Sequence, residues 1–456
     1  MTTTLDELDG LVQALGDAVL TYPATCEAYR HDWAREPGAG TPLAVVRARS
    51  AADVQTALRW ASRHGVPVVP RGAGTGLSGG SSAVDGGLVV SLEQMQAVEI
   101  DVETRVAVVE SGALNSAVKA AAAEHGLWYP PDPASYEICS VGGNVATNAG
   151  GLCCVKYGVT SDYVLGLDVV LADGTLVTLG GKRIKDVAGL NLLKLFVGSE
   201  GTLGIITRVL LRLVPAQPPR ATLVASFPTV TAAARAVVAT GRAVQPSMLE
   251  LMDRAAINAV EDHKPMGLDR TAGALLIAQS DAPATAAAAE VAVIEAACRA
   301  AGADEVFVTD DPAEGEMFLA ARRVAFHAIE VRGSLLLEDV GVPVPRLPEL
   351  VEGVAAVAAE LAVEIPVVAH AGDGNAHPMI VFDPTDPAGA ARAHQAFEQI
   401  MTLALDLGGT ITGEHGVGRT KRGALPAQLG ADVMALSHRI KDALDPQGIL
   451  NPGAVL

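Results

Sequence analysis

Two segments in the last part of the chain carry side chains that could hold a metal ion. In VVAHAGDGNAHPMIVF, two apolar strand arms flank a turn and bring His370 and His377 to the mouth of a hairpin from opposite arms. In TGEHGVG, Glu414 and His415 are neighbours in an extended segment, so their side chains should point to opposite sides and have different roles. Two imidazoles with a carboxylate suit Zn²⁺, Mn²⁺ or Fe²⁺. Ordinary hairpin histidines beside a surface Glu-His pair are the alternative, which the presence of both motifs disfavours.

Other polar side chains could bind a substrate or only shape the backbone. In FLAARRVAF, the guanidinium of Arg322 or Arg323 could bind a carboxylate with two hydrogen bonds, although most arginines are solvated surface groups. Asp373 and Asn375 are expected mainly to form the turn of the hairpin, with a supporting role beside the metal ligands as the second choice.

Three glycine-rich segments could cradle a ligand that carries phosphate. In PRGAGTGLSGG (Pro70 to Gly80), the missing side chains let consecutive backbone N–H groups approach an anion. Its alternating glycines run on into Ser-Gly-Gly instead of opening a helix, which disfavours a nicotinamide dinucleotide site. SVGGNVATNAGG and FVGSEGTLGIIT add two further loops. One such loop alone is as compatible with a flexible turn, but three of them suit one long ligand with a pyrophosphate and two ring systems.

The order of these motifs resembles that of a known family. PRGAGTGLSGG, PPDP, VGGNVATNAGG, GSEGTLGIIT, HAGDGNAH, GEHGVG and DPQGILNPG follow one another as in the FAD-linked oxidases of the vanillyl-alcohol oxidase superfamily. The most similar branch is that of D-lactate dehydrogenase and the FAD subunit of glycolate oxidase. The resemblance covers nearly the whole chain. It implies an α+β protein with a two-subdomain PCMH-type FAD-binding domain, a ferredoxin-like cap and a C-terminal helical segment that returns to the flavin.

The resemblance also implies which residues line FAD. The glycine loop should hold the pyrophosphate, and the tail should return to the flavin. No histidine stands where relatives attach the flavin, so FAD should be bound non-covalently, and Cys139 is expected to be a small buried residue. The residues implied to bind FAD are Pro70, Arg71, Gly72, Ala73, Gly74, Thr75, Gly76, Leu77, Ser78, Pro131, Asp132, Ser135, Gly142, Gly143, Asn144, Thr147, Asn148, Gly150, Gly151, Tyr157, Glu200, Gly204, Ile205, Ile206 and Asn451.

By the same resemblance, the metal and catalytic roles can be divided. His370, His377 and Glu414 would hold a divalent metal, with zinc or manganese expected, while His415 acts as base and Arg322 binds the substrate carboxylate. The metal would lower the pKa of the substrate hydroxyl, His415 would take its proton, and a hydride would pass from C2 to flavin N5. The implied reaction is the oxidation of D-lactate or glycolate to the 2-oxo acid.

Alternatives to this interpretation remain open. Arg323 should face solvent, but a shift of one residue would exchange it with Arg322. A larger acid such as D-2-hydroxyglutarate is the nearest rival, although Phe326 and Leu337 stand where that branch has polar residues. A flavin-free metallohydrolase would leave the glycine loops unexplained. A non-catalytic FAD subunit of a redox complex is the third alternative.

The elements that must position these residues suggest several domains. Strand, helix and strand patterns over residues 41–70 form a βαβ opening, and PAQPP is expected to be a linker. The β-α-β units beyond it suggest the ferredoxin-like cap, and IKDALDPQGILNPG should be a helix that stops in a turn. No internal repeat is evident. The expected domains are an N-terminal helical segment (1–38), the FAD-binding domain (39–217), the cap (218–410) and a C-terminal segment (411–456).

Composition limits the partners and the compartment. With 52 acidic against 33 basic residues, the formal charge of −19 argues against nucleic acid as a partner. Five cysteines without paired spacing, an acidic N-terminal amphipathic helix and the lack of a long apolar run suggest a cytoplasmic protein, peripheral to a membrane only through a redox partner. The electron acceptor is open between a quinone, a cytochrome, an iron-sulfur or electron-transfer protein and oxygen. The oligomeric state is open too, a homodimer included.

Overall fold

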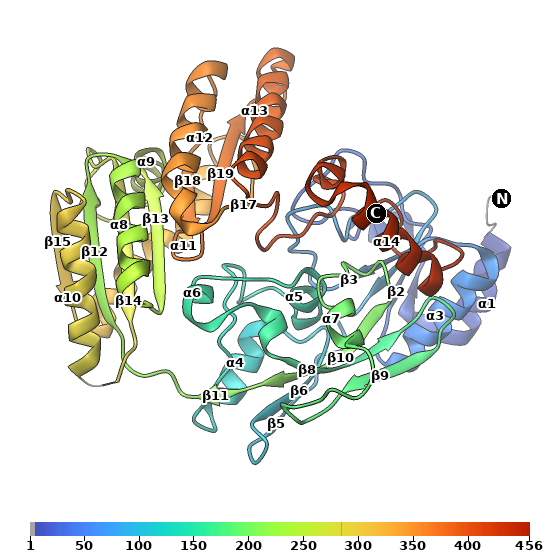
Figure 1. Ribbon diagram of the computed structural model, residues 1–456. Coiled ribbons are helices and arrows are strands. Elements are labelled where there is room, and N and C mark those ends of the chain that lie inside the picture. The colour runs from blue at the N-terminus through green and yellow to red at the C-terminus, as the bar shows by residue number, and fades with distance from the viewer. Residues whose placement is uncertain (1–4, 284) are drawn as a thin grey trace. The chain divides into compact units, whose positions relative to one another are not determined.

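The predicted βαβ opening lies in the first of two units into which the chain divides (Figure 1). The computed structural model describes residues 5–283 and 285–456. Within these, the first unit contains residues up to 150, 159–216 and 414–456, and the second contains residues 151–158 and 217–413. Both units combine helices with sheets, which confirms the predicted α+β class.

A mainly parallel sheet lies at the start of the first unit, with the strand order β1-β2-β4-β3. Its elements are α1 (Leu5–Leu15), β1 (Val19–Leu20), α2 (Pro23–Glu27), β2 (Ala44–Arg47), α3 (Ala51–His64), β3 (Val68–Arg71) and β4 (Leu88–Ser91). The first four residues of the predicted N-terminal helix lie outside the described residues. Helix α3 begins where the Ser50 hydroxyl accepts the N–H of Asp53 at 3.2 Å, and it ends at Gly65 in the left-handed conformation with φ 65°.

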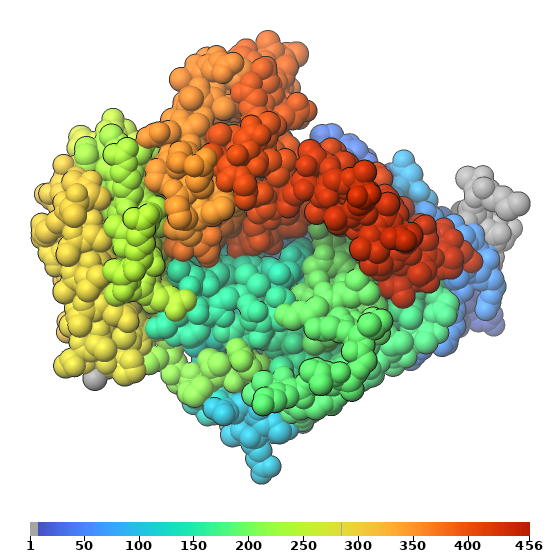
Figure 2. Space-filling view, viewed as in Figure 1, coloured from blue at the N-terminus to red at the C-terminus, as the bar shows by residue number. Residues whose placement is uncertain are grey.

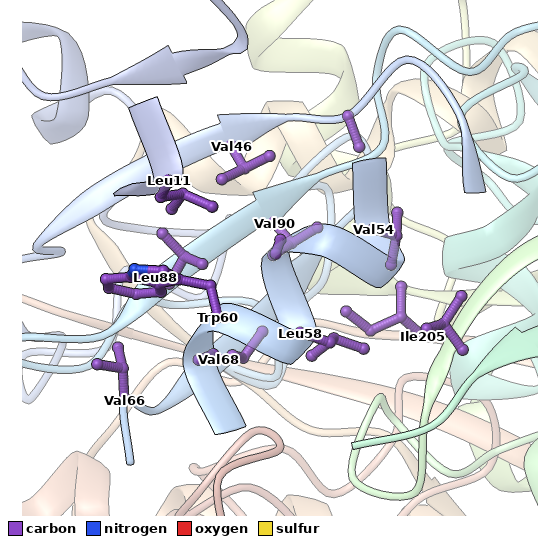
Figure 3. Close-up of a cluster of buried hydrophobic side chains, with 14 of the residues drawn as sticks. Leu11, Val46, Val54, Leu58, Trp60, Val66, Val68, Leu88, Val90 and Ile205 are labelled. Atoms are coloured by element: carbon purple, nitrogen blue, oxygen red, sulfur yellow. The ribbon is translucent and has the colours of Figure 1, made fainter. Parts of the chain in front are cut away.

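The apolar side of α3 packs onto this sheet (Figure 3). Val54, Leu58 and Trp60 of the helix are buried, because the hydrophobic residues recur at helical spacing. They belong to one cluster with Leu11, Val46, Val68, Leu88, Val90 and Ile205. This cluster fixes β3, the strand from which the first glycine loop leaves.

The second sheet of the first unit is antiparallel, with the order β5-β6-β10-β8-β9. Its elements are β5 (Val98–Asp101), β6 (Val106–Glu110), α4 (Asn115–Ala123), β7 (Leu127–Trp128), α5 (Val141–Thr147), β8 (Val164–Val170), β9 (Leu176–Gly180), α7 (Leu192–Phe196), β10 (Ile205–Arg212) and β11 (Val214–Pro215). Strands β7 and β11 pair apart from it. The two sheets give the first unit the two predicted subdomains.

The C-terminal tail returns to the edge of the first sheet. Helix α14 (Leu425–Leu444) stops in a turn, as the sequence predicts. The Val68 N–H then donates to the Ile449 carbonyl, and the Asn451 N–H donates to the Val68 carbonyl, each at 2.7 Å. These two bonds align the tail beside β3, so that Asn451 lies next to the start of the glycine loop.

The second unit is built on one antiparallel sheet of eight strands, in the order β15-β12-β14-β13-β18-β19-β16, with β17 also paired to β19. Its elements are α6 (Cys154–Tyr157), β12 (Ala221–Phe227), α8 (Val230–Ala243), β13 (Met248–Asp253), α9 (Arg254–His263), β14 (Ala274–Ser280), α10 (Thr285–Ala300), β15 (Glu305–Thr309), α11 (Pro312–Glu330), β16 (Ser334–Leu337), β17 (Val340–Gly341), α12 (Leu347–Leu361), β18 (Val367–His370), β19 (Asn375–Phe382) and α13 (Pro387–Asp406).

This sheet contains the predicted ferredoxin-like motif, partly repeated. From β12 to β15 the chain runs βαββαβ, with α9 inserted, and the sheet order of these four strands is 4-1-3-2. From β16 to α13 the chain follows the same path without a fourth strand, and its order β18-β19-β16 is 2-3-1. The two parts join where β13 pairs with β18. The structure thus repeats a motif for which the sequence shows no internal repeat.

Helices cover both faces of this sheet. Helices α8, α10, α12 and α13 pack against one another on one face, while α9 and α11 pack together over the other. Figure 2 shows α12 and α13 side by side at the surface of this unit, in orange to red-orange. Among the described residues, no helix has the length and hydrophobicity that crossing a membrane requires.

Candidate functional site

The first glycine loop leaves the end of β3 and presents its backbone to a ligand. A Cβ at Gly74, where φ is +73°, would lie 2.2 Å from the Arg71 guanidinium, and a Cβ at Gly72 would lie 2.2 Å from the Ser140 hydroxyl. Side chains therefore do not fit where the loop passes these two groups. Within the described part of the chain, no residue accepts a hydrogen bond from the N–H groups of Thr75 to Leu77. A run of available N–H groups beside a buried arginine fits the pyrophosphate of FAD.

The second glycine cluster corrects one expectation, because half of it is a helix and not a loop. The Ser140 hydroxyl accepts the Gly143 N–H at 3.3 Å and starts α5, which ends at Asn148 with φ 54°. Glycine is needed at position 142, because a Cβ there would lie 2.5 Å from Cβ of Ser111. The helix N-terminus with the Ser140 cap therefore lies against the first loop, where the Ala73 N–H also donates to the Ser140 hydroxyl at 3.3 Å.

Several side chains that the sequence assigned to FAD hold the loops in place. Asn144 donates to the Cys139 sulfur at 3.2 Å and accepts from Asn115 at 3.1 Å. The Asn148 side chain accepts the Ser161 N–H at 2.8 Å. Asn451 donates to the carbonyls of Gly80 and Glu200, each at 2.7 Å. These side chains shape the cradle, and its backbone remains the part that faces a ligand.

The other residues assigned to FAD occupy three places. Ile205 and Ile206 are core residues of β10, and Gly204 stands before them, where a Cβ would lie 2.5 Å from Val169. The Pro131 carbonyl accepts from Asn115 at 3.3 Å, in the segment that also holds Asp132 and Ser135. Gly151 and Tyr157 belong to the second unit, where the Tyr157 hydroxyl donates to Asp281.

The TGEHGVG segment is fixed by a buried carboxylate of the first unit. Glu200 accepts the N–H groups of Val417 at 2.7 Å and Gly418 at 2.9 Å. The Ser78 hydroxyl also donates to the His415 carbonyl at 3.1 Å. Only glycine fits at position 418, because φ is +51° and a Cβ would lie 2.0 Å from the Ser78 carbonyl oxygen. Burial raises the pKa of Glu200 to about 7, although its two N–H donors favour the ionised form.

The extended pattern predicts that Glu414 and His415 point to opposite sides, and this prediction is wrong. The backbone bends at both residues, and Nε2 of His415 lies 3.7 Å from Oε1 of Glu414. The alternation rule fails here because it holds only for an extended strand. The carboxylate and the imidazole can therefore act on one ligand.

In the second unit, the hairpin of β18 and β19 brings the two predicted histidines together. His370 pairs with Asn375 across the turn of residues 371–374, and His377 pairs with Val368. Their imidazole centroids are 5.0 Å apart, with the rings at 85° to each other. Both residues are buried, with exposures of 4% and 5%. The predicted hairpin is thus confirmed, and two imidazoles converge on one face of the sheet.

Glu250 is a site residue that the sequence analysis missed. It lies on β13 directly opposite His370, so both side chains share a face. Nδ1 of His370 lies 2.8 Å from Oε1 of Glu250, and Nε of Arg322 lies 2.9 Å from Oε2. The sequence does contain a signal for this residue, because Glu250 stands at the centre of the apolar strand SMLELMD. Buried charges are rare unless they are paired, so a carboxylate in such a strand indicates a charged partner.

Asp339 is a second residue that the sequence analysis missed. Asp339 directly precedes Val340, which pairs with Ala376 on β19. Its Oδ1 lies 3.6 Å from Nδ1 of His377 and accepts a hydrogen bond from the Asn375 side chain at 2.9 Å. Its other oxygen accepts the Gly413 N–H at 3.0 Å. Asn375 therefore belongs to the strand and binds Asp339, which corrects the expectation that it mainly shapes the turn. Asp373 stays in the turn and accepts the Asn375 N–H at 3.4 Å.

The two arginines of α11 face different environments. Arg322 is buried and pairs with Glu250, whereas Arg323 is exposed and pairs with Glu316. Phe326 and Leu337 pack against the same apolar cluster that lies under this face of the sheet. The face thus combines two imidazoles, two carboxylates and one guanidinium with apolar walls. Such a set can hold a divalent cation and a small anion with an apolar substituent.

Comparisons with known proteins agree with these observations. A family model described as "FAD linked oxidases, C-terminal domain" matches residues 216–455, and one described as "FAD binding domain" matches residues 42–180. The chain is 40% identical to glycolate oxidase subunit GlcD of Bacillus subtilis over 415 residues, which is 90% of this chain and 88% of that protein. It is 34% identical to D-lactate dehydrogenase of Archaeoglobus fulgidus over 459 residues, which is 99% of each protein.

A solved structure shares the fold at low identity. The chain matches p-cresol methylhydroxylase with a TM-score of 0.82 and 18% identity, over 99% of this chain and 97% of that chain. The likeness extends through both units, because it covers nearly the whole chain.

Glu200 should make the stability of the protein depend on pH. Its folded pKa lies near 7 against an ordinary 4.5, so stability is lost as the pH rises through this window and the buried carboxyl ionises. Glu200→Gln cannot ionise. The free energy of unfolding of the wild type, relative to that of the variant, should therefore fall by about 3 kcal/mol across the window.

Thermal unfolding of both proteins at about pH 5 and about pH 8 checks this expectation. Glutamine lacks one of the two acceptor oxygens, so the variant loses stability by an amount that does not depend on pH. The test is therefore how the difference between the two unfolding midpoints changes with pH. A difference between the two unfolding midpoints that is the same at both pH values would contradict the assignment.

Proposed function

Because the chain belongs to the family of FAD-linked oxidases, we propose that it oxidises a small D-2-hydroxy acid, D-lactate or glycolate, to the 2-oxo acid. The observation that carries this proposal is the buried face of the second unit, where Arg322 lies within one network with His370 and Glu250. A cationic fork beside imidazoles suits an acid that carries a hydroxyl on the neighbouring carbon. The proposal also agrees with the names of the two relatives.

FAD would be held by the first unit. Bound FAD supplies the acceptor for the hydride that leaves C2 of the substrate. The loop from Arg71 to Ser78 binds the pyrophosphate through the available N–H groups of Thr75 to Leu77, and Arg71 and the start of α5 favour its negative charge. No histidine lies in the loop, which supports non-covalent binding.

His370, His377 and Glu414 are proposed to hold a divalent metal, zinc or manganese. The convergence of the two buried imidazoles supports this. A divalent ion held by these ligands supplies the Lewis acidity that lowers the pKa of the substrate hydroxyl. The carboxylate of Glu250 orients the imidazole of His370, while that of Asp339 lies 3.6 Å from Nδ1 of His377 and places a negative charge beside it.

Arg322 and His415 are proposed to act on the substrate itself. Arg322 binds the carboxylate, and the buried side chain of Glu250 limits how its guanidinium can turn. His415 takes the hydroxyl proton on its imidazole as the hydride leaves, a role that suits a group whose ordinary pKa is near neutrality. Arg323, which is exposed, takes no part.

Phe326 and Leu337 support a small monocarboxylate. Both contribute apolar surface to the cluster beside Arg322 and offer no partner for a second carboxylate. Burying an unpaired charge there would cost more than an apolar wall can return. A larger acid such as D-2-hydroxyglutarate is therefore expected to bind weakly.

A protein electron acceptor is also proposed, because the relative from Bacillus subtilis is named as a subunit. The reduced flavin would then pass its electrons to a partner rather than to oxygen.

Steady-state turnover on four acids tests the proposed substrate. With an artificial acceptor, D-lactate or glycolate should give a kcat/KM at least about tenfold above that of L-lactate and D-2-hydroxyglutarate, because one apolar wall and one cationic fork discriminate by a few kcal/mol. Oxygen consumption measured in parallel separates an oxidase from a dehydrogenase. Equal turnover of all four acids would refute the small-substrate proposal.

His415→Ala should lower kcat by about 100-fold or more, because it removes the proposed base. FAD content, read from the visible absorbance, should not change, since the cradle is intact. His438→Ala, an exposed histidine of the same C-terminal segment, is the matched control and should turn over like the wild type. A His415→Ala variant with turnover equal to that of this control would exclude the base role.

A further inference from the structure

Glu250 is a fully buried carboxylate beside the histidine pair. Its side chain has no exposed surface, and it lies among Met248, Met252 and Leu319 of the apolar cluster between β13 and α11. Removing a carboxylate and a guanidinium from water carries a large desolvation cost that their attraction often does not recover. Apolar side chains of similar volume would fill this space at less cost. The Glu250–Arg322 pair is therefore poorly explained as a device for stability.

The geometry of the carboxylate determines the state of the imidazole beside it. Both oxygens approach Nδ1 of His370, at 2.8 and 3.0 Å. A carboxylate only accepts hydrogen bonds, so Nδ1 must carry the hydrogen, and the neutral ring then has its lone pair on Nε2. The antiparallel register supports this contact, since Glu250 and His370 are direct partners across β13 and β18. Ring orientation and tautomer are thus both set by one side chain.

The same carboxylate restrains the arginine. Oε2 of Glu250 lies 2.9 Å from Nε of Arg322, so the ion pair limits where the planar guanidinium can lie. The terminal amino groups of Arg322 supply further N–H donors, and a carboxylate is bound best by a fork of two such donors. One residue therefore touches both groups to which the metal and the substrate are assigned.

The geometry points to Glu250 as a positioning residue that couples the metal site to the substrate site, an inference that rests on the proposed function. It holds His370 with Nε2 directed to a divalent metal and Arg322 with its fork directed to the substrate carboxylate. Carboxylates that accept from a metal-bound histidine raise the affinity of such sites in general. Here the same carboxylate also orders the arginine, so its loss weakens both binding steps.

Glu250→Gln tests the coupling, with Zn²⁺ as the probe on the FAD-loaded protein. The glutamine side chain has one acceptor oxygen and one NH2 donor, so it cannot accept from both His370 and Arg322. Either its NH2 group faces Arg322, or its NH2 group donates to Nδ1 of His370 and forces the ring hydrogen onto Nε2. We expect the zinc Kd, measured by competition with a chromophoric chelator, to rise about 10- to 100-fold. The KM for D-lactate should rise as well, by more than kcat falls.

Glu261→Gln is the matched control. Glu261 is a buried carboxylate of the same unit, and its Oε1 accepts the N–H groups of Met266 and Leu268, which the amide oxygen of glutamine can still do. This variant should keep the zinc Kd and the KM of the wild type. A double-mutant cycle adds a measurement that a purely structural role would not move: in a His370→Ala background, Glu250→Gln should change the zinc Kd little further.

The outcomes separate the inference from the proposed function. A Glu250→Gln protein that binds zinc as tightly as the Glu261→Gln control would overturn the role of Glu250 and leave the metal site standing. A wild-type protein that binds no zinc would overturn both the proposed metal site and this inference. Additive effects in the cycle would show that Glu250 does not act through His370.

Glu250→Asp keeps the test open if the glutamine variant does not fold. It retains the charge next to Arg322 but withdraws the oxygens by one methylene from Nδ1. The zinc Kd of this variant should lie several-fold above that of the wild type. Where the glutamine variant also folds, the Kd of the aspartate variant should lie between the other two. An unchanged Kd would overturn the inference.

Discussion

The arrangement of the candidate site depends on the register of three antiparallel strands. Glu250 on β13 stands opposite His370 on β18, and β18 meets β19 through a turn of residues 371–374. Because side chains alternate along a strand, a slip of one residue would turn every member of this group to the other face. The apolar neighbours Met252 and Val368, which are themselves paired and buried, oppose such a slip. Apolar packing thus fixes the positions of the polar groups.

A comparable constraint acts in the first unit, where backbones come too close for side chains. The glycine loop, the start of α5 and the TGEHGVG segment approach one another, with Ser78, Ser140 and Glu200 supplying the hydrogen bonds between them. The tail then adds Asn451, which donates to the carbonyl of Gly80 in the glycine loop and to that of Glu200. The motifs that are far apart in the sequence therefore form one cradle, and their glycines mark the points of contact.

Local patterns were enough to predict much of this structure. The βαβ opening, the final helix and the hairpin of His370 and His377 follow from periodicity and turn residues, which act over short stretches of chain. The split between buried Arg322 and exposed Arg323 was left open, because a helix pattern alone does not resolve a shift of one residue. The resemblance to FAD-linked oxidases supplied the family and the cofactor, which the family models confirm.

What the sequence could not supply comes from long-range pairing. Glu250 precedes His370 by 120 residues, and only the sheet order brings them together. Asp339 reaches His377 by the same means. Helix α5 was read as a loop because its glycines carry low helix propensity, yet the Ser140 cap and the close contact with Ser111 decide in favour of a helix. The bend at Glu414 depends on contacts of the following residues with Glu200.

The central claim, hydride transfer from a small D-2-hydroxy acid to bound FAD, is tested most directly without oxygen or any added acceptor. The purified protein is mixed anaerobically with D-lactate, L-lactate, glycolate and D-2-hydroxyglutarate in turn, and the visible flavin band is recorded. The account predicts bleaching by D-lactate or glycolate and a persistent yellow colour with the other two acids. A flavin band that none of the four acids bleaches would contradict it.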